Sequence, residues 1–320
     1  MNETNKIDIL DLPRDPFECR ESLLAKTAAP TLSITTNYIK TEYANSELLE
    51  TAQLFADYDL LDAAPSAGDT LRKLSLFPWI ESSNELEKSL SLIMLSFYKN
   101  SYDSMRRALE LIVVGSFFIL DDIDVDRSMA WLKSNENTPN FRRMLEKLIK
   151  YEPYCSCEKH CKFCAYLLDL YYRLSDYIHV KGIEKSQRKI KPVTDRFNGV
   201  ELLGFDEKPC KESLDLYIET VQAIGLLCAL STPWLLIGFD LDSKFGFNPP
   251  LSGFFEYDQA ERIRLLIPEK FCPFIDRLKE TDERIRSIAE WFEDLPDLTQ
   301  EEYTRQAEEF RKEHDFTKKW

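Results

Sequence analysis

Residues 155–182 read CSCEKHCKFCAYLLDLYYRLSDYIHVKG, and they hold half of the eight cysteines and two of the three histidines of this 320-residue chain. In the second half of this stretch, apolar side chains recur every three or four residues, at Leu167, Leu170, Tyr171, Leu174 and Ile178. That period is typical of a helix with one buried face. We therefore expect a helix from about Cys164 to Val180, directly after a cysteine-rich segment.

The cysteine-rich segment has the spacing C-x-C-x3-C-x2-C, formed by Cys155, Cys157, Cys161 and Cys164. Four soft donors so close together can close a tetrahedral zinc site, with His160 as a spare ligand. The same cysteines are also consistent with free thiols at a helix start, or with a redox pair whose thiolate is favoured by the helix dipole. We expect one structural zinc ion, bound by at least three of the four cysteines.

The polar face of the predicted helix carries charged residues that can pair. Asp169, Arg173 and Asp176 lie at helical spacing on the side opposite to the apolar stripe. Arg173 and His179 are six residues apart, which places them about 9 Å apart along a helix axis and roughly 120° apart around it. A long guanidinium and an imidazole can converge on one phosphate from these positions. Arg173 and His179 are therefore the candidate catalytic residues.

The motif Arg173-Leu-Ser-Asp-Tyr-Ile-His179 fits the pattern R-x(4–6)-H. Through this motif the chain resembles the HEPN domains, whose name stands for higher eukaryotes and prokaryotes nucleotide-binding. An upstream predicted helix with Arg106, Arg107 and Glu110 is similar to the first helix of bacterial HEPN-like proteins. The resemblance covers about residues 85–235.

This resemblance implies a HEPN-like helical bundle. In the ribonuclease members of the family, two copies of the motif meet at a dimer cleft and cleave RNA without metal. For this chain the resemblance implies that His179 is the acid–base residue and that Arg173 stabilises the phosphorane. It also implies a homodimer and, by analogy, a role in prokaryotic defence.

A basic run follows the motif in a chain whose net charge is −15. Residues 151–200 carry nine Lys/Arg against six Asp/Glu, a local balance of +3. The candidate nucleic-acid-binding residues in this run are Lys181, Lys185, Arg188, Lys189 and Lys191. Such a run attracts the phosphates of RNA. The alternative is a solvated connector without a ligand.

The remaining sequence favours an all-α fold. Only nine glycines are present and none lies in a G-x-G-x-x-G or G-x-x-x-x-G-K pattern, which disfavours Rossmann and P-loop folds. We expect an irregular, partly helical segment over residues 1–80 and a helical core over residues 81–240. The cysteine cluster at 155–164 would be an insertion in this core, and a C-terminal helical extension would cover residues 241–320.

Two S/T-x-x-E patterns mark expected helix starts, because the hydroxyl and the carboxylate of a capping box each bond a free backbone N–H. Ser82 and Glu85 would open the core with one long helix or two, with a break near residues 100–101. On this element Arg106 and Glu110 would pair. Thr299 and Glu302 would open the final helix.

The acidic run at residues 121–126 resembles the start of a calcium loop. We reject that site, because Arg127 stands where the loop needs glycine and Lys133 stands where it needs glutamate. The acids are expected to cap a helix that begins at Arg127, since negative charge is favourable at a helix N-terminus. A further helix is expected from Asn140 to Lys150.

The longest apolar run, residues 223–239, is interrupted by polar residues and by Pro233. It falls short of the ~20 residues that a membrane span needs. A buried core helix over residues 211–231 is therefore expected, and no membrane association. The first residues show no apolar segment typical of a secretory signal, so we expect a cytoplasmic protein with reduced cysteines.

Two functional hypotheses follow. In the first, the protein is a HEPN-like effector that cleaves RNA or binds nucleotides, with RNA and a second copy of the chain as partners. In the second, it is a non-catalytic helical scaffold or sensor that zinc stabilises. The metal content and an RNA cleavage assay without added metal separate the two.

Overall fold

The computed structural model describes residue 13 and residues 15–65, 69–120, 123–178 and 204–313, and every regular element in these ranges is a helix. The N-terminal elements are α1 (Pro16–Glu42), α2 (Glu47–Leu54), the π-helical turn η2 (Phe55–Asp59) and α3 (Leu60–Asp62). The core elements are α4 (Asp69–Met94), α5 (Tyr98–Phe118), α6 (Val125–Leu132), α7 (Phe141–Leu148), α8 (Tyr154–Cys161), α9 (Phe163–Ile178) and α11 (Glu207–Ser231). The C-terminal elements are the 3₁₀ turn η4 (Pro233–Leu236), α12 (Leu241–Phe245), α13 (Tyr257–Leu266), the 3₁₀ turn η5 (Glu269–Phe271), α14 (Cys272–Thr281), α15 (Glu283–Asp294) and α16 (Gln300–Glu313). The predicted all-α class is confirmed for the described residues.

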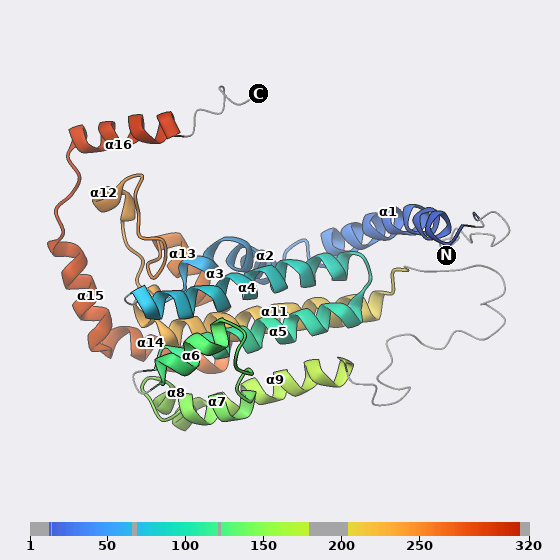
Figure 1. Cartoon of the computed structure of the whole chain (residues 1–320), viewed down its shortest axis with the longest axis horizontal. Helices are drawn as coiled ribbons and strands as arrows, with labels where there is room; N and C mark the ends of the chain where they lie inside the picture. Colours follow the sequence, from blue (N-terminus) through green and yellow to red (C-terminus); the bar gives the residue numbers. More distant parts are fainter. Residues whose placement is uncertain (1–12, 14, 66–68, 121–122, 179–203, 314–320) are drawn as a thin grey trace.

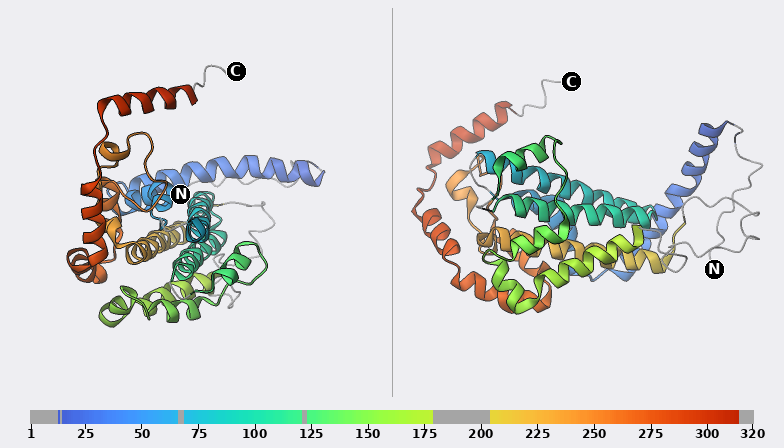
Figure 2. Two further views of the ribbon diagram at one scale, coloured as in Figure 1. Left: turned by 60° about the vertical axis from the view of Figure 1, so that its left-hand side comes forward. Right: turned by 60° about the horizontal axis from the view of Figure 1, so that its bottom comes forward.

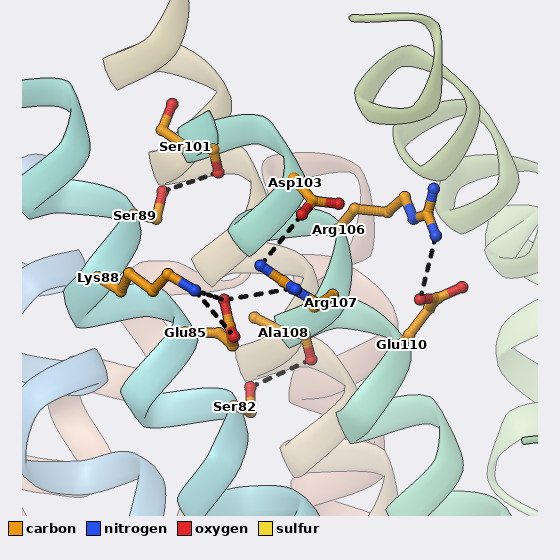
Figure 3. A network of polar contacts seen from close by, with 10 residues as sticks. All are labelled: Ser82, Glu85, Lys88, Ser89, Ser101, Asp103, Arg106, Arg107, Ala108 and Glu110. Carbon is orange, nitrogen blue, oxygen red and sulfur yellow. Dashed lines mark hydrogen bonds and ion pairs between the residues drawn. The ribbon is translucent and has the colours of Figure 1, made fainter. Parts of the chain in front are cut away.

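The centre of the molecule is an antiparallel pair of long helices, α4 and α5, flanked by α11 and α9 (Figure 1). Two buried serines on α4 tie the pair together. The Ser82 hydroxyl donates to the carbonyl of Ala108 at 3.1 Å, and the Ser89 hydroxyl donates to the carbonyl of Ser101 at 3.2 Å (Figure 3). These bonds satisfy buried polar atoms while the helices stay in close contact.

The predicted helix start at Ser82 was wrong. Helix α4 is continuous from Asp69 to Met94, and Ser82 is fully buried in its interior. Glu85 does not reach back to cap a helix, because its carboxylate lies near Lys88 and Arg107 instead. A match to the S-x-x-E pattern cannot distinguish a helix start from a helix interior when the hydroxyl has another acceptor. The break between the two long helices lies just before Tyr98, close to the expected position.

Helix α11 is the buried core helix that the sequence predicts. Its apolar stripe is buried throughout, at Leu214, Ile218, Val221, Ile224, Leu227 and Cys228. The helix ends before Pro233. By length and composition it could cross a membrane, but 83% of the tested window is buried inside the fold. That burial fits a core helix.

The N-terminal segment is more ordered than the sequence predicts. Helix α1 is capped by Asp15, whose side chain accepts from the backbone N–H groups of Phe17 and Glu18 at 2.9 and 3.0 Å. Pro30 lies inside the helix. The N-terminal half of α1 projects beyond the bundle, at the end opposite to α15 and α16 (Figure 2).

A buried carboxylate joins the N-terminal elements to α13. Asp59, the last residue of η2, accepts from the Arg262 guanidinium at 2.7 and 2.8 Å and from the Gln259 amide at 3.2 Å. Gln259 also donates to Asp62 at 2.9 Å. Because both sides of this contact are helical turns, it fixes α13 against η2 and α3.

The caps expected from the acidic run and from Thr299 are confirmed, whereas Asn140, expected as the first residue of a helix, is instead the cap of α7. Asp124 accepts from the N–H of Arg127 at 3.1 Å and caps α6, and Asn140 caps α7 in the same way at 3.3 Å. Thr299 and Glu302 bond one another's backbone N–H groups, at 2.9 and 3.3 Å, and open α16.

The C-terminal elements pack around a second apolar cluster. Its buried residues are Phe239, Leu241 and Phe292. Lys244 on α12 closes the cluster by bonding Asp297 at 2.7 Å and the carbonyl of Leu295 at 2.6 Å. These contacts hold the segment between α15 and α16 against α12.

Candidate functional site

Arg173 lies at the edge of the polar face of α9, half-buried between the exposed side and the neighbouring helix α11. Its Nε donates to Asp169 at 2.8 Å, one turn earlier on the same helix, which confirms the predicted pairing of these two residues. A second bond runs from the guanidinium of Arg173 to Glu219 on α11. The Arg173 side chain is 40% exposed. Arg173 is therefore partly accessible, but its guanidinium is bonded to two carboxylates, those of Asp169 and Glu219.

Tyr166 lies on the same side of α9 as Arg173, seven residues earlier. Its hydroxyl is buried and has no hydrogen-bond partner among the described residues. Burial raises the pKa of this phenol, and the nearby Glu219 raises the pKa further while Arg173 opposes the change. The ammonium of Lys270 lies 4.1 Å from the centre of its ring. Tyr166 is therefore an uncharged, buried donor without an acceptor among the described residues.

A second polar cluster joins α9 to α5. Arg106 and Glu110 form the predicted pair, at 3.7 Å (Figure 3). Glu110 also accepts from the hydroxyl of Tyr171 on α9 at 2.8 Å, and the Arg106 guanidinium lies 5.5 Å from the centre of the Tyr171 ring. Burial, with a contribution from Glu110, raises the pKa of Tyr171 to about 12. Tyr171 is therefore a neutral donor that holds the two helices together.

The remaining residues of the predicted RNA site lie outside the described part of the chain. They are His179, Lys181, Lys185, Arg188, Lys189 and Lys191. The geometry of Arg173 relative to His179 therefore stays a prediction.

The cysteine-rich segment is helical. Cys155, Cys157 and Cys161 lie on α8, and Cys164 lies in the first turn of α9. Cys157 is buried and the other three are partly exposed. Cys157 and Cys161 are one turn apart, close enough for their thiols to interact. Within the described ranges, no group of three or more histidine, cysteine or acidic side chains is placed to hold a metal ion, so the zinc site stays a prediction.

Burial favours the neutral thiols of Cys157, Cys161 and Cys164. Burial raises the pKa of Cys157 and Cys161, and it raises the pKa of Cys164 to about 12. The Nδ1 of His160, the expected spare ligand, lies 2.8 Å from the carbonyl of Ser156, and its ring stacks near Phe274. The contact with Ser156 engages only one of the two ring nitrogens. The raised pKa values of Cys161 and Cys164 disfavour the thiolate that a redox pair needs.

Sequence reasoning missed Glu219, the cross-helix partner of Arg173. One signal was available, since Glu219 is an isolated charge within the apolar stretch of α11. A carboxylate in such a stretch generally has a specific partner. Tyr166 gave no comparable signal, because an aromatic residue next to an apolar stripe is typical of a helix in a core.

Comparison of the chain with protein-family models, with curated proteins and with solved structures finds no match in any of the three.

Proposed function

We propose that the protein is a HEPN-like effector that binds RNA and cleaves it without a metal ion, with Arg173 and His179 as its catalytic pair. The observation that carries this proposal is the position of Arg173, a partly exposed guanidinium on the polar face of α9. Further support is the packing of α9 against α5 through Glu110 and Tyr171. These two helices carry Arg173 and the upstream residues Arg106, Arg107 and Glu110 of the HEPN resemblance.

The proposed reaction needs proton transfer and charge stabilisation. An imidazole nitrogen of His179 accepts the proton of a ribose 2′-hydroxyl, and the 2′-oxygen forms a bond to the adjacent phosphorus atom. The bond from phosphorus to the 5′-oxygen breaks, and the leaving oxygen takes a proton from the second motif of a dimer or from water. The products are a 2′,3′-cyclic phosphate and a 5′-hydroxyl. Arg173 stabilises the negative charge that develops on the phosphoryl oxygens.

The basic run after the motif would attract the RNA. Its residues Lys181, Lys185, Arg188, Lys189 and Lys191 concentrate positive charge in a chain of net charge −15. Lys189→Glu is expected to weaken RNA binding, and the loss should shrink as the salt concentration rises.

The test compares initial rates of single-stranded RNA cleavage in the presence of EDTA. Arg173→Ala is expected to lower the rate by about 100-fold or more, the typical cost of removing one donor to a transition state. The matched control is Arg286→Ala, which removes an exposed arginine from α15. Equal rates for the wild-type protein and Arg173→Ala would overturn the proposed catalytic role.

The second candidate function is a non-catalytic scaffold or sensor stabilised by zinc. One observation favours it, which is the proximity of the Cys157 and Cys161 thiols on one face of α8. Metal analysis of protein purified without chelator is expected to find one zinc ion per chain. Cys161→Ala should then lower the melting temperature of the zinc-bound protein more than the control Cys272→Ala, because metal-binding energy contributes to folding.

The absence of bound zinc, together with free titration of all four clustered thiols, would overturn the zinc site. Bound zinc without any RNA cleavage would favour the scaffold over the nuclease.

A further inference from the structure

The guanidinium of Arg173 bonds two carboxylates at once, those of Asp169 and Glu219. The three groups together carry one positive and two negative charges. A phosphodiester that approaches Arg173 therefore meets a cluster with a net negative charge. Arg173 can stabilise a phosphate only after at least one of its carboxylate partners has been displaced.

The two carboxylates differ in how firmly they hold Arg173. Asp169 is 69% exposed, so water and salt screen its interaction with the guanidinium. Glu219 is 28% exposed and belongs to a different helix, α11. It is the better shielded partner, and its position does not depend on the rotamers of α9. Glu219 is therefore the contact that decides whether Arg173 is available.

Tyr166 supplies an alternative donor for Glu219. Its hydroxyl is buried without a partner among the described residues, which is unfavourable for a polar group. Tyr166 lies two turns before Arg173 on α9, on the same side of the helix, and Arg173 bonds Glu219. If Arg173 moves to a phosphate, the hydroxyl of Tyr166 can donate to the released carboxylate. The departure of Arg173 then leaves Glu219 with a donor.

We propose that Glu219 acts as a latch on Arg173: it holds the guanidinium when no ligand is bound, a phosphodiester of RNA displaces it, and the Tyr166 hydroxyl donates to the displaced carboxylate. Glu219 is then a positioning residue, because it acts through Arg173. This inference rests on the proposed function, since it takes Arg173 to be a phosphate-binding group.

The test measures binding of a fluorescent, 2′-O-methylated single-stranded RNA, which cannot be cleaved at the 2′-oxygen. Glu219→Gln keeps the shape of the side chain and removes its charge. At low salt it is expected to bind the RNA about five-fold more tightly than the wild-type protein, the equivalent of one ion pair of modest strength. When Arg173 is already replaced by alanine, Glu219→Gln should give no gain in affinity for the RNA.

One further variant separates the latch from a change of overall charge, and another tests the role of Tyr166. Glu212→Gln removes the same charge from α11, where Glu212 pairs with Lys208 at 3.8 Å, and its affinity is expected to match that of the wild-type protein. Tyr166→Phe removes only the hydroxyl that would donate to the displaced Glu219. Its affinity for the RNA is expected to fall about three-fold, which corresponds to the loss of one hydrogen bond.

The outcomes distinguish the latch from the function on which it rests. The latch is overturned if Glu219→Gln binds no more tightly than the wild-type protein, or if its gain persists without Arg173. If the latch fails while Arg173→Ala still abolishes cleavage, the proposed function stands. If Arg173→Ala binds and cleaves RNA like the wild-type protein, the proposed function falls and the latch falls with it.

Discussion

At the scale of single residues, Asp59 is the most completely buried charge in the described part of the chain. It receives two hydrogen bonds from Arg262 and one from Gln259. A buried ion pair adds little stability compared with apolar residues of the same shape, but the loss of one partner leaves an unpaired charge. The separation of 203 positions between Asp59 and Arg262 explains why the sequence did not reveal this pair.

Arg262→Met is expected to lower the free energy of unfolding by about 3–5 kcal/mol, because it leaves the Asp59 carboxylate buried without its cation. Urea denaturation measures the change. The control is Glu212→Ala, which breaks an exposed pair and should cost less than about 1 kcal/mol. Similar losses for the two variants would show that Asp59 does not depend on Arg262.

The surroundings of Arg173 show the same limit of sequence reasoning. Its bond to Asp169 was predictable, because residues four apart on a helix are neighbours. Its bond to Glu219 was not, because 46 residues separate the two and no local rule places α11 beside α9. Local pairs follow from spacing, whereas pairs between helices depend on how the helices pack.

At the scale of helices, the sequence predicted those with a strong apolar stripe or a clear cap. The stripe of α11, the stripe positions Leu167, Leu170 and Leu174 of α9, and the caps of α6 and α16 are confirmed. The prediction failed for α1, because the scattered prolines of residues 1–80 suggested irregular structure. Pro30 is tolerated within α1, although proline usually breaks a helix interior. The start of α4 was misplaced because a buried serine imitates a cap.

The close approach of α4 and α5 depends on Gly115. A Cβ atom at this position would lie 2.1 Å from the ring of Trp79, which is fully buried. Gly115→Ala is therefore expected to destabilise the protein by about 1–3 kcal/mol through overpacking, measured as a lower free energy of unfolding in urea.

The matched control for this prediction is Gly225→Ala on α11. Its Cβ would lie 3.5 Å from the nearest atom, an ordinary contact distance. Alanine has the higher helix propensity by about 1 kcal/mol, so the control should be neutral or stabilising. A neutral Gly115→Ala would mean that α4 and α5 can separate at no cost.

The cap of α15 gives a prediction for the pH dependence of stability. Burial raises the pKa of Asp282, but hydrogen bonds from the N–H and the guanidinium of Arg284 outweigh this and lower the pKa. A group with a lowered pKa in the folded state stabilises the protein above its unfolded pKa. That contribution is lost as the pH falls through the folded value.

Between pH 5 and pH 3, values that bracket the unfolded aspartate pKa of about 3.9, the wild-type protein should therefore lose more stability than Asp282→Asn. The variant keeps a capping side chain but has no charge to titrate. Melting temperatures at the two pH values give the comparison, and equal losses would contradict the role of this carboxylate.

At the scale of the whole molecule, the described residues form one helical bundle with α1 and α16 at its ends (Figure 1). The sequence could predict the all-α class, because helical periodicity recurs along the chain. It could not predict the arrangement of the candidate site, because Arg173 is held by a helix far along the chain. The expected dimer cleft is a property of two chains, and it stays a prediction.

If the proposed function holds, α9 lies at a two-fold interface, since a composite cleft needs two motifs. Tyr172 on α9 is 49% exposed and would be covered in such a dimer. Sedimentation at micromolar concentration is expected to find a dimer for the wild-type protein and a shift to monomer for Tyr172→Lys. Tyr58→Lys, at an exposed site on η2, should leave the dimer intact. A monomeric wild-type protein would contradict the cleft.

The most direct test of the proposed RNA cleavage by Arg173 and His179 is the mass of the products. Single-stranded RNA is incubated in EDTA with the wild-type protein or with folded His179→Ala. The proposed mechanism predicts fragments that end in a 2′,3′-cyclic phosphate with the wild-type protein, and intact RNA with the variant. Intact RNA with both proteins, or the same fragments with both, would contradict it.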